Sequence, residues 1–283
     1  MTMKPEDKIS GSVDGCFYVI KFNCPQTLNA MSYDDFLYTT RLLDRAERDP
    51  NVYFTVLQSS GKYFSSGADF RSVPNNPSGD EGTELTRWLE NFLAKNQYIT
   101  SSFIKHSKVL IACLNGPAIG LSAAIVLLCD LVYSMDARGT KNFLQFPFSQ
   151  LGLSCEGATS VTLPQKIGRN AASTKLFFGE RLYFADMLHS VINRDYALDD
   201  GDVDKFNTQV MQDLRAKIRG LYLPAVLQMK DVLRASNDTV SKLELANSKE
   251  VHGALPYWVD GEPQRRFARL RDAKLAARGR SKI

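Results

Sequence analysis

Short apolar runs alternate with helical segments along the first half of the chain, and this alternation constrains the fold more than any other feature. The apolar runs are rich in β-branched and aromatic residues, as buried strands are, and they lie at 16–23, 52–60, 108–116 and 131–137. The helical segments repeat their apolar residues at helical spacing and lie at 32–50, 84–107 and 121–130. Strands that alternate with helices predict an α/β core in which some strands pair in parallel.

The rest of the chain differs in pattern from this core. Residues 71–84 are dense in Pro, Gly, Asn and Ser, which predicts a surface loop that could serve as a lid. From about Asp202 onward the spacing of apolar residues is helical. We therefore expect a core over residues 1–201 and a C-terminal helical region over residues 202–283.

Several classes of protein are disfavoured by charge, cysteine usage and motif content. The formal net charge is only +4, with much of the excess in residues 264–283, so the charge does not argue for nucleic-acid binding. The five cysteines have no CxxC spacing, and the three histidines form no metal-binding pattern. No GxSxG, GxGxxG or P-loop motif is present, and no stretch approaches the ~20 apolar residues that span a membrane. We expect a soluble, non-secreted protein with no metal site and no membrane span.

Two predicted strands end in turns of small residues. "YFSSGADF" at 63–70 follows one strand, and "NGPAIGLSAA" at 115–124 follows another. Small side chains allow close approach of a ligand, and the first N–H groups of a following helix have no partner of their own. The two turns could therefore each supply one donor to the same oxygen, although each could equally be a tight turn between buried elements.

A single carboxylate, Glu156, lies among small and apolar residues in "LGLSCEGATS". One explanation is local, because Ser154 could cap a helix that carries Glu156 in its first turn, where the helix dipole favours an acidic side chain. The other explanation is catalytic, because a lone carboxylate in a dry pocket suits proton transfer. The residues alone leave both explanations open.

The two turns, the glutamate segment and their order resemble the crotonase (enoyl-CoA hydratase/isomerase) superfamily. The resemblance covers roughly residues 12–167 and implies a crotonase-like ββα spiral core, followed by C-terminal helices that build trimers or dimers of trimers. It also implies that Ala68 N–H and Leu121 N–H form an oxyanion hole for the carbonyl of an acyl-CoA thioester. Within the superfamily, "SSGKYFSSGADF", "FIKHSKVLIACLNGPAIGLSAA" and "YWVDGEP" are most similar to the peroxisomal 3-enoyl-CoA isomerases, in which Glu156 matches the catalytic base.

Hydratases of this superfamily use two glutamates to deliver water, and both of their positions differ here. The resemblance places them at Ala124 and Phe148. It therefore implies an isomerase that moves a cis or trans 3-enoyl-CoA double bond to the 2-trans position in fatty-acid β-oxidation, with Glu156 as its only base. Two alternatives stay open. One is a dienoyl-CoA isomerase, which would add a second acid; no carboxylate stands at a matching position, although Asp69 and Asp130 lie nearby in sequence. The other is a non-catalytic acyl-CoA-binding subunit.

The resemblance implies further roles for single residues. Asn96 matches a polar position that lines the pocket and could bind Glu156 or a water, unless it is an exposed helix residue. Residues implied to contact the coenzyme A part of the substrate are Lys62, Ala68, Asp69, Phe70 and Gly120. Coenzyme A is part of the substrate, so no separate cofactor is expected.

The last three residues, Ser281-Lys282-Ile283, nearly match the S-K-L address of peroxisomal proteins. This pattern predicts a peroxisomal matrix protein that binds the import receptor. The alternative is a basic helix end without any signal.

Overall fold

The computed structural model describes all residues of the chain except 1–2, 70, 72–80, 137–141, 199–200 and 281–283. Its larger sheet has six strands in the order β1 (Ile9–Asp14), β2 (Phe17–Phe22), β3 (Phe54–Ser59), β4 (Val109–Leu114), β6 (Leu131–Asp136) and β9 (Arg194–Ala197). β1 and β2 pair antiparallel, and every later pair in this sheet is parallel. The α/β core with parallel pairing that the sequence predicts is confirmed.

A smaller sheet lies beside the two turns of small residues. It has three strands in the order β5 (Ala118–Ile119), β7 (Phe143–Gln145) and β8 (Arg181–Tyr183). β5 pairs in parallel with β7, which fixes the turn after β4 against the strand that leads toward Glu156. This small sheet therefore ties together two of the segments that the sequence marks as functional.

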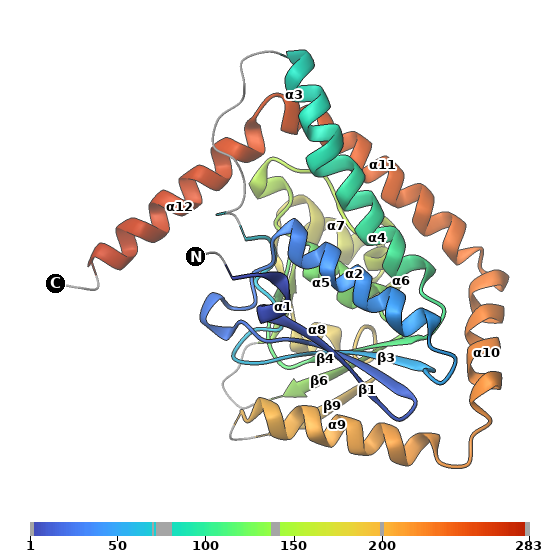
Figure 1. Cartoon of the computed structure of the whole chain (residues 1–283). Helices are drawn as coiled ribbons and strands as arrows, with labels where there is room; N and C mark the ends of the chain where they lie inside the picture. The colour runs from blue at the N-terminus through green and yellow to red at the C-terminus, as the bar shows by residue number, and fades with distance from the viewer. Residues whose placement is uncertain (1–2, 70, 72–80, 137–141, 199–200, 281–283) are drawn as a thin grey trace.

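Helices cover both faces of the larger sheet (Figure 1). One face packs against α2 (Tyr33–Arg48), α4 (Lys95–Lys105), α5 (Leu121–Leu128) and α6 (Thr159–Ile167). The opposite face packs against α9 (Val203–Ile218), through Phe206 and Val210. Because both faces are buried, strands such as β3 and β4 consist of buried residues throughout, as parallel strands usually do.

The remaining helical segments are short connections or C-terminal helices. The short ones are α1 (Pro5–Lys8), η1 (Pro25–Thr27), η4 (Ser149–Leu151), α7 (Arg169–Phe177) and α8 (Phe184–Met187). The C-terminal ones after α9 are α10 (Leu223–Ser236), α11 (Thr239–Val259) and α12 (Glu262–Arg280). α11 packs on α4 and α6, whereas α12 runs away from the body in Figure 1. The division at residue 201 stays a prediction.

Two predictions of local structure differ in detail from the structure. The predicted loop at 71–84 ends early, because α3 (Glu81–Trp88) begins at Glu81, and residues 72–80 lie outside the described residues. The predicted helix at 84–107 is confirmed as a helical segment, but a π-helix, η3 (Leu89–Ala94), separates α3 from α4 within it. A π-helical turn changes the direction in which later side chains point, and such turns are frequent at functional sites.

An aromatic cluster lies at this π-helical turn. Trp88, Phe92, Trp258 and Phe267 pack together, and the ring centroids of the two tryptophans lie 4.5 Å apart. The cluster joins α3, η3, α11 and α12, so the C-terminal helices are attached to the core beside the cavity described below.

Candidate active site

The two turns of small residues lie directly against each other. Phe64 N–H and Ser65 N–H donate to the carbonyl of Pro117 at 3.0 and 3.3 Å, and Ile119 N–H donates back to Ser65 at 3.0 Å. The hydroxyl of Ser122 donates to the Ser65 hydroxyl at 2.8 Å. These bonds hold the turn after β3 and the turn after β4 as one unit.

Gly67 shows how closely the two turns approach. Its φ is +82°, and a Cβ built at this position would lie 2.5 Å from the carbonyl oxygen of Ile119. Only glycine fits this site, since any side chain would push the turns apart. The next residue in the chain is Ala68, so the contact fixes where the Ala68 N–H lies.

The two N–H groups implied to form the oxyanion hole are free to bind a ligand. Leu121 is the first residue of α5, where helical N–H groups have no intrahelical partner. Within the described ranges, neither Ala68 N–H nor Leu121 N–H donates a hydrogen bond. Gly120 N–H, by contrast, donates to the carbonyl of Gln145 at 2.8 Å. That bond anchors the start of α5 while leaving the Leu121 donor available.

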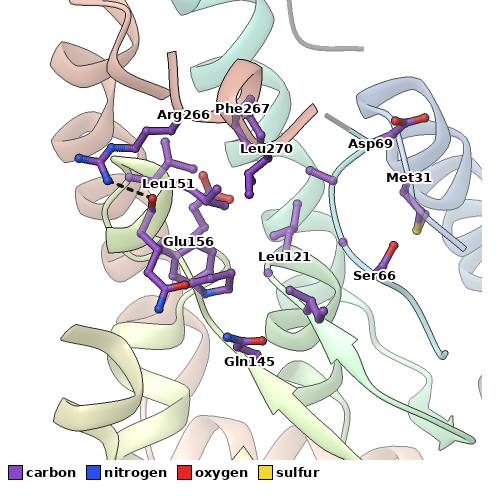
Figure 2. A pocket seen from close by; sticks show the side chains of 18 of the residues that line it. Met31, Ser66, Asp69, Leu121, Gln145, Leu151, Glu156, Arg266, Phe267 and Leu270 are labelled. Carbon is purple, nitrogen blue, oxygen red and sulfur yellow. Dashed lines mark hydrogen bonds between the residues drawn. The ribbon is translucent and has the colours of Figure 1, made fainter. Parts of the chain in front are cut away.

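Both turns border a cavity of about 820 Å³ that also holds Glu156. In the view of Figure 2, Glu156 and Leu151 lie on one side of the cavity and Ser66 and Asp69 on the other, with Leu121 between them. Phe267 and Leu270 of α12 lie above, and apolar side chains make up much of the wall. A cavity of this size and character suits an organic ligand with an apolar part.

Glu156 is carried on an unusual turn between η4 and α6. The next two residues, Gly157 and Ala158, both have left-handed backbones, with φ of +69° and +60°. A Cβ at Gly157 would lie 2.4 Å from the Cβ of Ala124, so the turn packs tightly on α5. The Ser154 cap that the sequence left open is absent, because the residue at the N-cap of α6 is Ala158.

The surroundings of Glu156 favour its uncharged form. The side chain is buried, and burial raises the pKa of Glu156 from its ordinary value of 4.5 to about 7. Asn96 lowers this pKa and the nearby negative charge of Glu250 raises it, both by less than burial does. Among the described residues no Lys, Arg or His lies within ion-pair distance of Glu156. Such a carboxyl group exists in both protonation states at neutral pH, so it can accept a proton and return it.

Two polar side chains, the buried Asn96 and the half-buried Tyr33, lie close to Glu156. Asn96, at the start of α4, has no exposed surface, so the alternative of an exposed helix residue is wrong. Its amide approaches both Glu156 and Tyr33 and lowers the pKa of each, although neither amide atom reaches full hydrogen-bond geometry with a described residue. Burial raises the pKa of Tyr33, and the charge of Glu156 raises it further, so the phenol keeps its proton.

Some of the other predicted site residues line the cavity, and others lie away from it. Asp69 and Gly120 line the cavity with Ala68, whereas the exposed Lys62 does not, and Phe70 lies outside the described residues. Asp69 forms an ion pair with Arg71 at 2.7 Å. Asp130 also lies away from the cavity, where it pairs with Lys230 at 2.6 Å.

The two positions at which hydratases carry glutamate are apolar and buried. Phe148 lines the cavity, and Ala124 packs against the turn that carries Glu156. Within the described part of the chain, the carboxylates lining the cavity are Glu156 and Asp69. No group of three potential metal ligands and no helix able to span a membrane occurs among the described residues.

Sequence reasoning missed several cavity residues. Arg181, Arg266 and Arg269 place positive charge on the cavity wall, and Arg266 donates to the carbonyl of Gln150 at 3.1 Å. The basic residues of the tail were visible in the sequence, but nothing in the pattern showed that the first part of α12 borders the cavity. Tyr33 gave no signal, because its position depends on how α2 packs.

Comparison with known proteins agrees with this geometry. Residues 13–254 match the family model "Enoyl-CoA hydratase/isomerase". The chain is 44% identical to 3,2-trans-enoyl-CoA isomerase of Saccharomyces cerevisiae over 95% of both chains. It is 41% identical to Delta(3,5)-Delta(2,4)-dienoyl-CoA isomerase of the same organism, over 92% of this chain and 94% of the relative.

The fold has close counterparts among solved structures. An enoyl-CoA hydratase/isomerase from Pseudoalteromonas atlantica superposes with a TM-score of 0.74 at 21% identity, covering 94% of this chain and 97% of that one. The crotonase-like fold is thereby confirmed. The chain belongs to the enoyl-CoA hydratase/isomerase family, which is the crotonase superfamily.

Proposed function

We propose that the protein is a 3,2-trans-enoyl-CoA isomerase that uses Glu156 as its single base. The observation that carries this proposal is a buried Glu156 with a pKa of about 7, on a cavity that also receives two unpartnered backbone N–H groups. The yeast 3,2-trans-enoyl-CoA isomerase that is 44% identical supports it. The apolar residues at both hydratase positions support isomerisation over the addition of water.

The proposed reaction moves one proton between two carbons of the substrate. The Glu156 carboxylate removes a proton from C2 of a 3-enoyl-CoA, and the C–H electrons move into a dienolate whose negative charge lies on the thioester oxygen. Ala68 N–H and Leu121 N–H bind that oxygen, and each such donor contributes about 3–4 kcal/mol in comparable enzymes. Protonated Glu156 then delivers the proton to C4, which leaves the double bond between C2 and C3.

The cavity offers groups for the rest of the substrate. The acyl chain would lie along the apolar wall that includes Phe148 and Trp258. The phosphates of coenzyme A would meet Arg181, Arg266 and Arg269, which replace Lys62 as the candidates for this role. Asp69 and Gly120, beside Ala68, remain candidates for contacts to coenzyme A. The proposal requires no cofactor apart from the substrate itself.

The test is turnover of 3-trans-hexenoyl-CoA by the purified protein, with hydration of 2-trans-hexenoyl-CoA assayed in parallel. We expect isomerisation without hydration. Glu156→Ala should abolish isomerisation while acyl-CoA binding, measured by calorimetry, persists. A wild-type protein that binds acyl-CoA but turns over neither substrate would instead be the non-catalytic binding subunit.

A second candidate function is dienoyl-CoA isomerisation, which the relative at 41% identity favours. Such a reaction would call for a second acid, and Asp69 is the other carboxylate on the described cavity wall. Burial alone would raise the pKa of Asp69, but its hydrogen bonds from Arg71 outweigh burial and lower it. An ionised Asp69 is a poor acid at neutral pH, so we expect a 3,5-dienoyl-CoA to turn over more slowly than the 3-enoyl-CoA.

We also propose peroxisomal import and self-association. Ser281-Lys282-Ile283 lie outside the described residues, and their test is whether residues 264–283 carry a fluorescent protein into peroxisomes when fused to its C-terminus. Self-association into a homotrimer or homohexamer is supported by apolar side chains of α10 and its flank that are exposed in the single chain: Leu221, Tyr222, Met229, Val232 and Leu233. Light scattering after size-exclusion chromatography measures the oligomer directly.

A further inference from the structure

Glu250 is a buried carboxylate that binds the turn carrying Glu156. It lies on α11, about one hundred residues away in sequence, and only 5% of it is exposed. One carboxylate oxygen accepts a hydrogen bond from Ala158 N–H at 2.7 Å, and the other accepts one from Ser160 N–H at 2.8 Å. In the part of the chain that the structure describes, Glu250 has no Lys, Arg or His partner.

The backbone that Glu250 binds is one that the chain would not adopt without support. Ala158 has a left-handed backbone, which costs a residue with a side chain about 1–2 kcal/mol. The neighbouring Gly157 also has a left-handed backbone, and it packs tightly against Ala124 of α5. Glu250 binds this turn from α11, through the N–H groups of Ala158 and Ser160.

The same helix also fixes the neighbourhood of Asn96. Asn247, one turn before Glu250, is fully buried and donates from its side-chain amide to the carbonyl of Gln97 at 3.0 Å. α11 therefore contacts both segments that meet at Glu156, the turn before α6 and the start of α4.

We propose that Glu250 is a positioning residue for Glu156: its carboxylate clamps the left-handed turn at Gly157 and Ala158 and so directs the Glu156 side chain into the cavity. The catalytic importance of this positioning rests on the proposed function. The hydrogen bonds between Glu250 and the turn do not depend on which reaction the protein catalyses.

The clamp also has an electrostatic consequence. Two N–H donors favour the ionised form of Glu250, although burial raises its pKa overall. Its negative charge raises the pKa of Glu156. The other titratable groups near the pair stay uncharged at neutral pH, because burial raises the pKa of Tyr33 on α2 and raises that of Cys155 to about 11. Burial is thus the main cause of the raised pKa of Glu156, and the negative charge of ionised Glu250 adds to it.

Three variants separate charge from geometry. Glu250→Gln removes the charge and one of the two acceptors, whereas Glu250→Asp keeps the charge but shortens the side chain. Glu244→Gln is the matched control, since Glu244 lies on the same helix and accepts from Ser101 at 2.6 Å without touching the turn. Each is measured by the titration of Glu156 in ¹³C-glutamate spectra, assigned with Glu156→Gln, by amide exchange at Ala158 and Ser160, and by kcat and KM across pH.

In Glu250→Gln the titration midpoint of Glu156 should fall by roughly half a pH unit or more, and kcat should drop about tenfold with little change in KM. Glu250→Asp should keep the midpoint near that of the wild type, but exchange at the two amides should accelerate. Glu244→Gln should match the wild type in all readouts. If Glu250→Gln does not fold, Glu250→Asp and its amide exchange decide the question.

A lower melting temperature with unchanged midpoint, amide exchange and kcat would overturn the proposal, because Glu250 would then serve stability only. The titration and the exchange need no turnover. A wild type that fails to isomerise 3-enoyl-CoA would therefore refute the proposed function while the clamp is still tested.

Discussion

Two glutamates of this protein, Glu156 and Glu47, are shifted in opposite directions by their surroundings. Burial raises the pKa of both, but at Glu47 hydrogen bonds from His106 and Ser107 outweigh burial and lower the pKa to about 2. At Glu156 only Asn96 opposes burial, and the pKa rises to about 7. The two pKa values therefore differ mainly because the fold places more hydrogen-bond donors at Glu47 than at Glu156, and burial alone does not explain the difference.

The partners of Glu47 show what Glu156 lacks. Ser107 N–H donates to Glu47 at 3.0 Å, and His106 Nδ1 lies 3.0 Å from the same oxygen. Burial lowers the pKa of His106, so at neutral pH its ring donates a hydrogen bond to Glu47 as a neutral group. Glu47 is therefore held ionised as a structural group, whereas Glu156 is left able to change its protonation state.

The largest difference that we expect between variants of Glu156 and Glu47 is in turnover. Glu156→Gln should lower kcat for 3-trans-hexenoyl-CoA by about a thousandfold, since general acid–base groups contribute 10²- to 10⁴-fold. Glu47→Gln should leave kcat within about twofold, because Glu47 lies away from the cavity lining. Steady-state kinetics on both variants, with circular dichroism as a check on folding, make the comparison. Equal losses in both would remove the functional distinction between the two glutamates.

The free energy of unfolding should also distinguish the two glutamates, because we expect Glu156→Gln to stabilise the folded protein at high pH and Glu47→Gln to destabilise it. Because the folded pKa of Glu156 lies above its ordinary value of 4.5, ionising it costs stability as pH rises from about 4.5 to about 7. Glu156→Gln should therefore stabilise the protein at pH 8 by up to about 3 kcal/mol, and by almost nothing at pH 4. Urea unfolding at the two pH values measures the difference. A variant less stable than the wild type at pH 8 would contradict the raised pKa.

Asn96 should set part of the pH dependence of activity. Wild-type kcat/KM should rise with pH through about 7, as Glu156 ionises. Asn96→Leu removes the group that lowers the pKa of Glu156, so this rise should move to higher pH, and kcat/KM at pH 7 should fall about tenfold. Asn91→Leu, on the neighbouring exposed turn, is the control. A loss that is equal at every pH would mean that Asn96 acts on the substrate instead.

The sequence predicted the parallel core well because buried parallel strands leave a plain signal. β4 is a continuous apolar run and β3 is rich in apolar and β-branched residues, and their turns of small residues could be identified from the same stretch of chain. β1 was missed because its pattern, ISGSVD, is mostly polar and exposed. The π-helix was missed because Leu85, Trp88 and Leu89 fit an ordinary helical period as well.

Apart from Asn96, which the resemblance indicated, the candidate site was predictable only where its residues adjoin a motif. Ala68, Leu121 and Glu156 lie in or next to recognisable turns. Tyr33, Arg266 and Glu250 reach the site from helices that are remote in sequence, so only tertiary packing brings them there. The pKa of Glu156 depends on those helices too, which is why the direction of its shift could not be derived from its neighbours in the chain.

The smallest expected effect concerns the stability that Glu47 provides. Its folded pKa lies below its ordinary value, so its contribution is present above about pH 4.5 and is lost as pH falls toward about 2. Because Glu47 is 37% exposed, solvent screening reduces that contribution, and Glu47→Gln should cost no more than about 1 kcal/mol at pH 7. The cost should vanish near pH 2, whereas that of Glu156→Gln has the opposite sign and appears only at higher pH. Urea unfolding across pH compares the two, and a Glu47→Gln variant that is equally destabilised at every pH would show that lost packing, not charge, accounts for the effect.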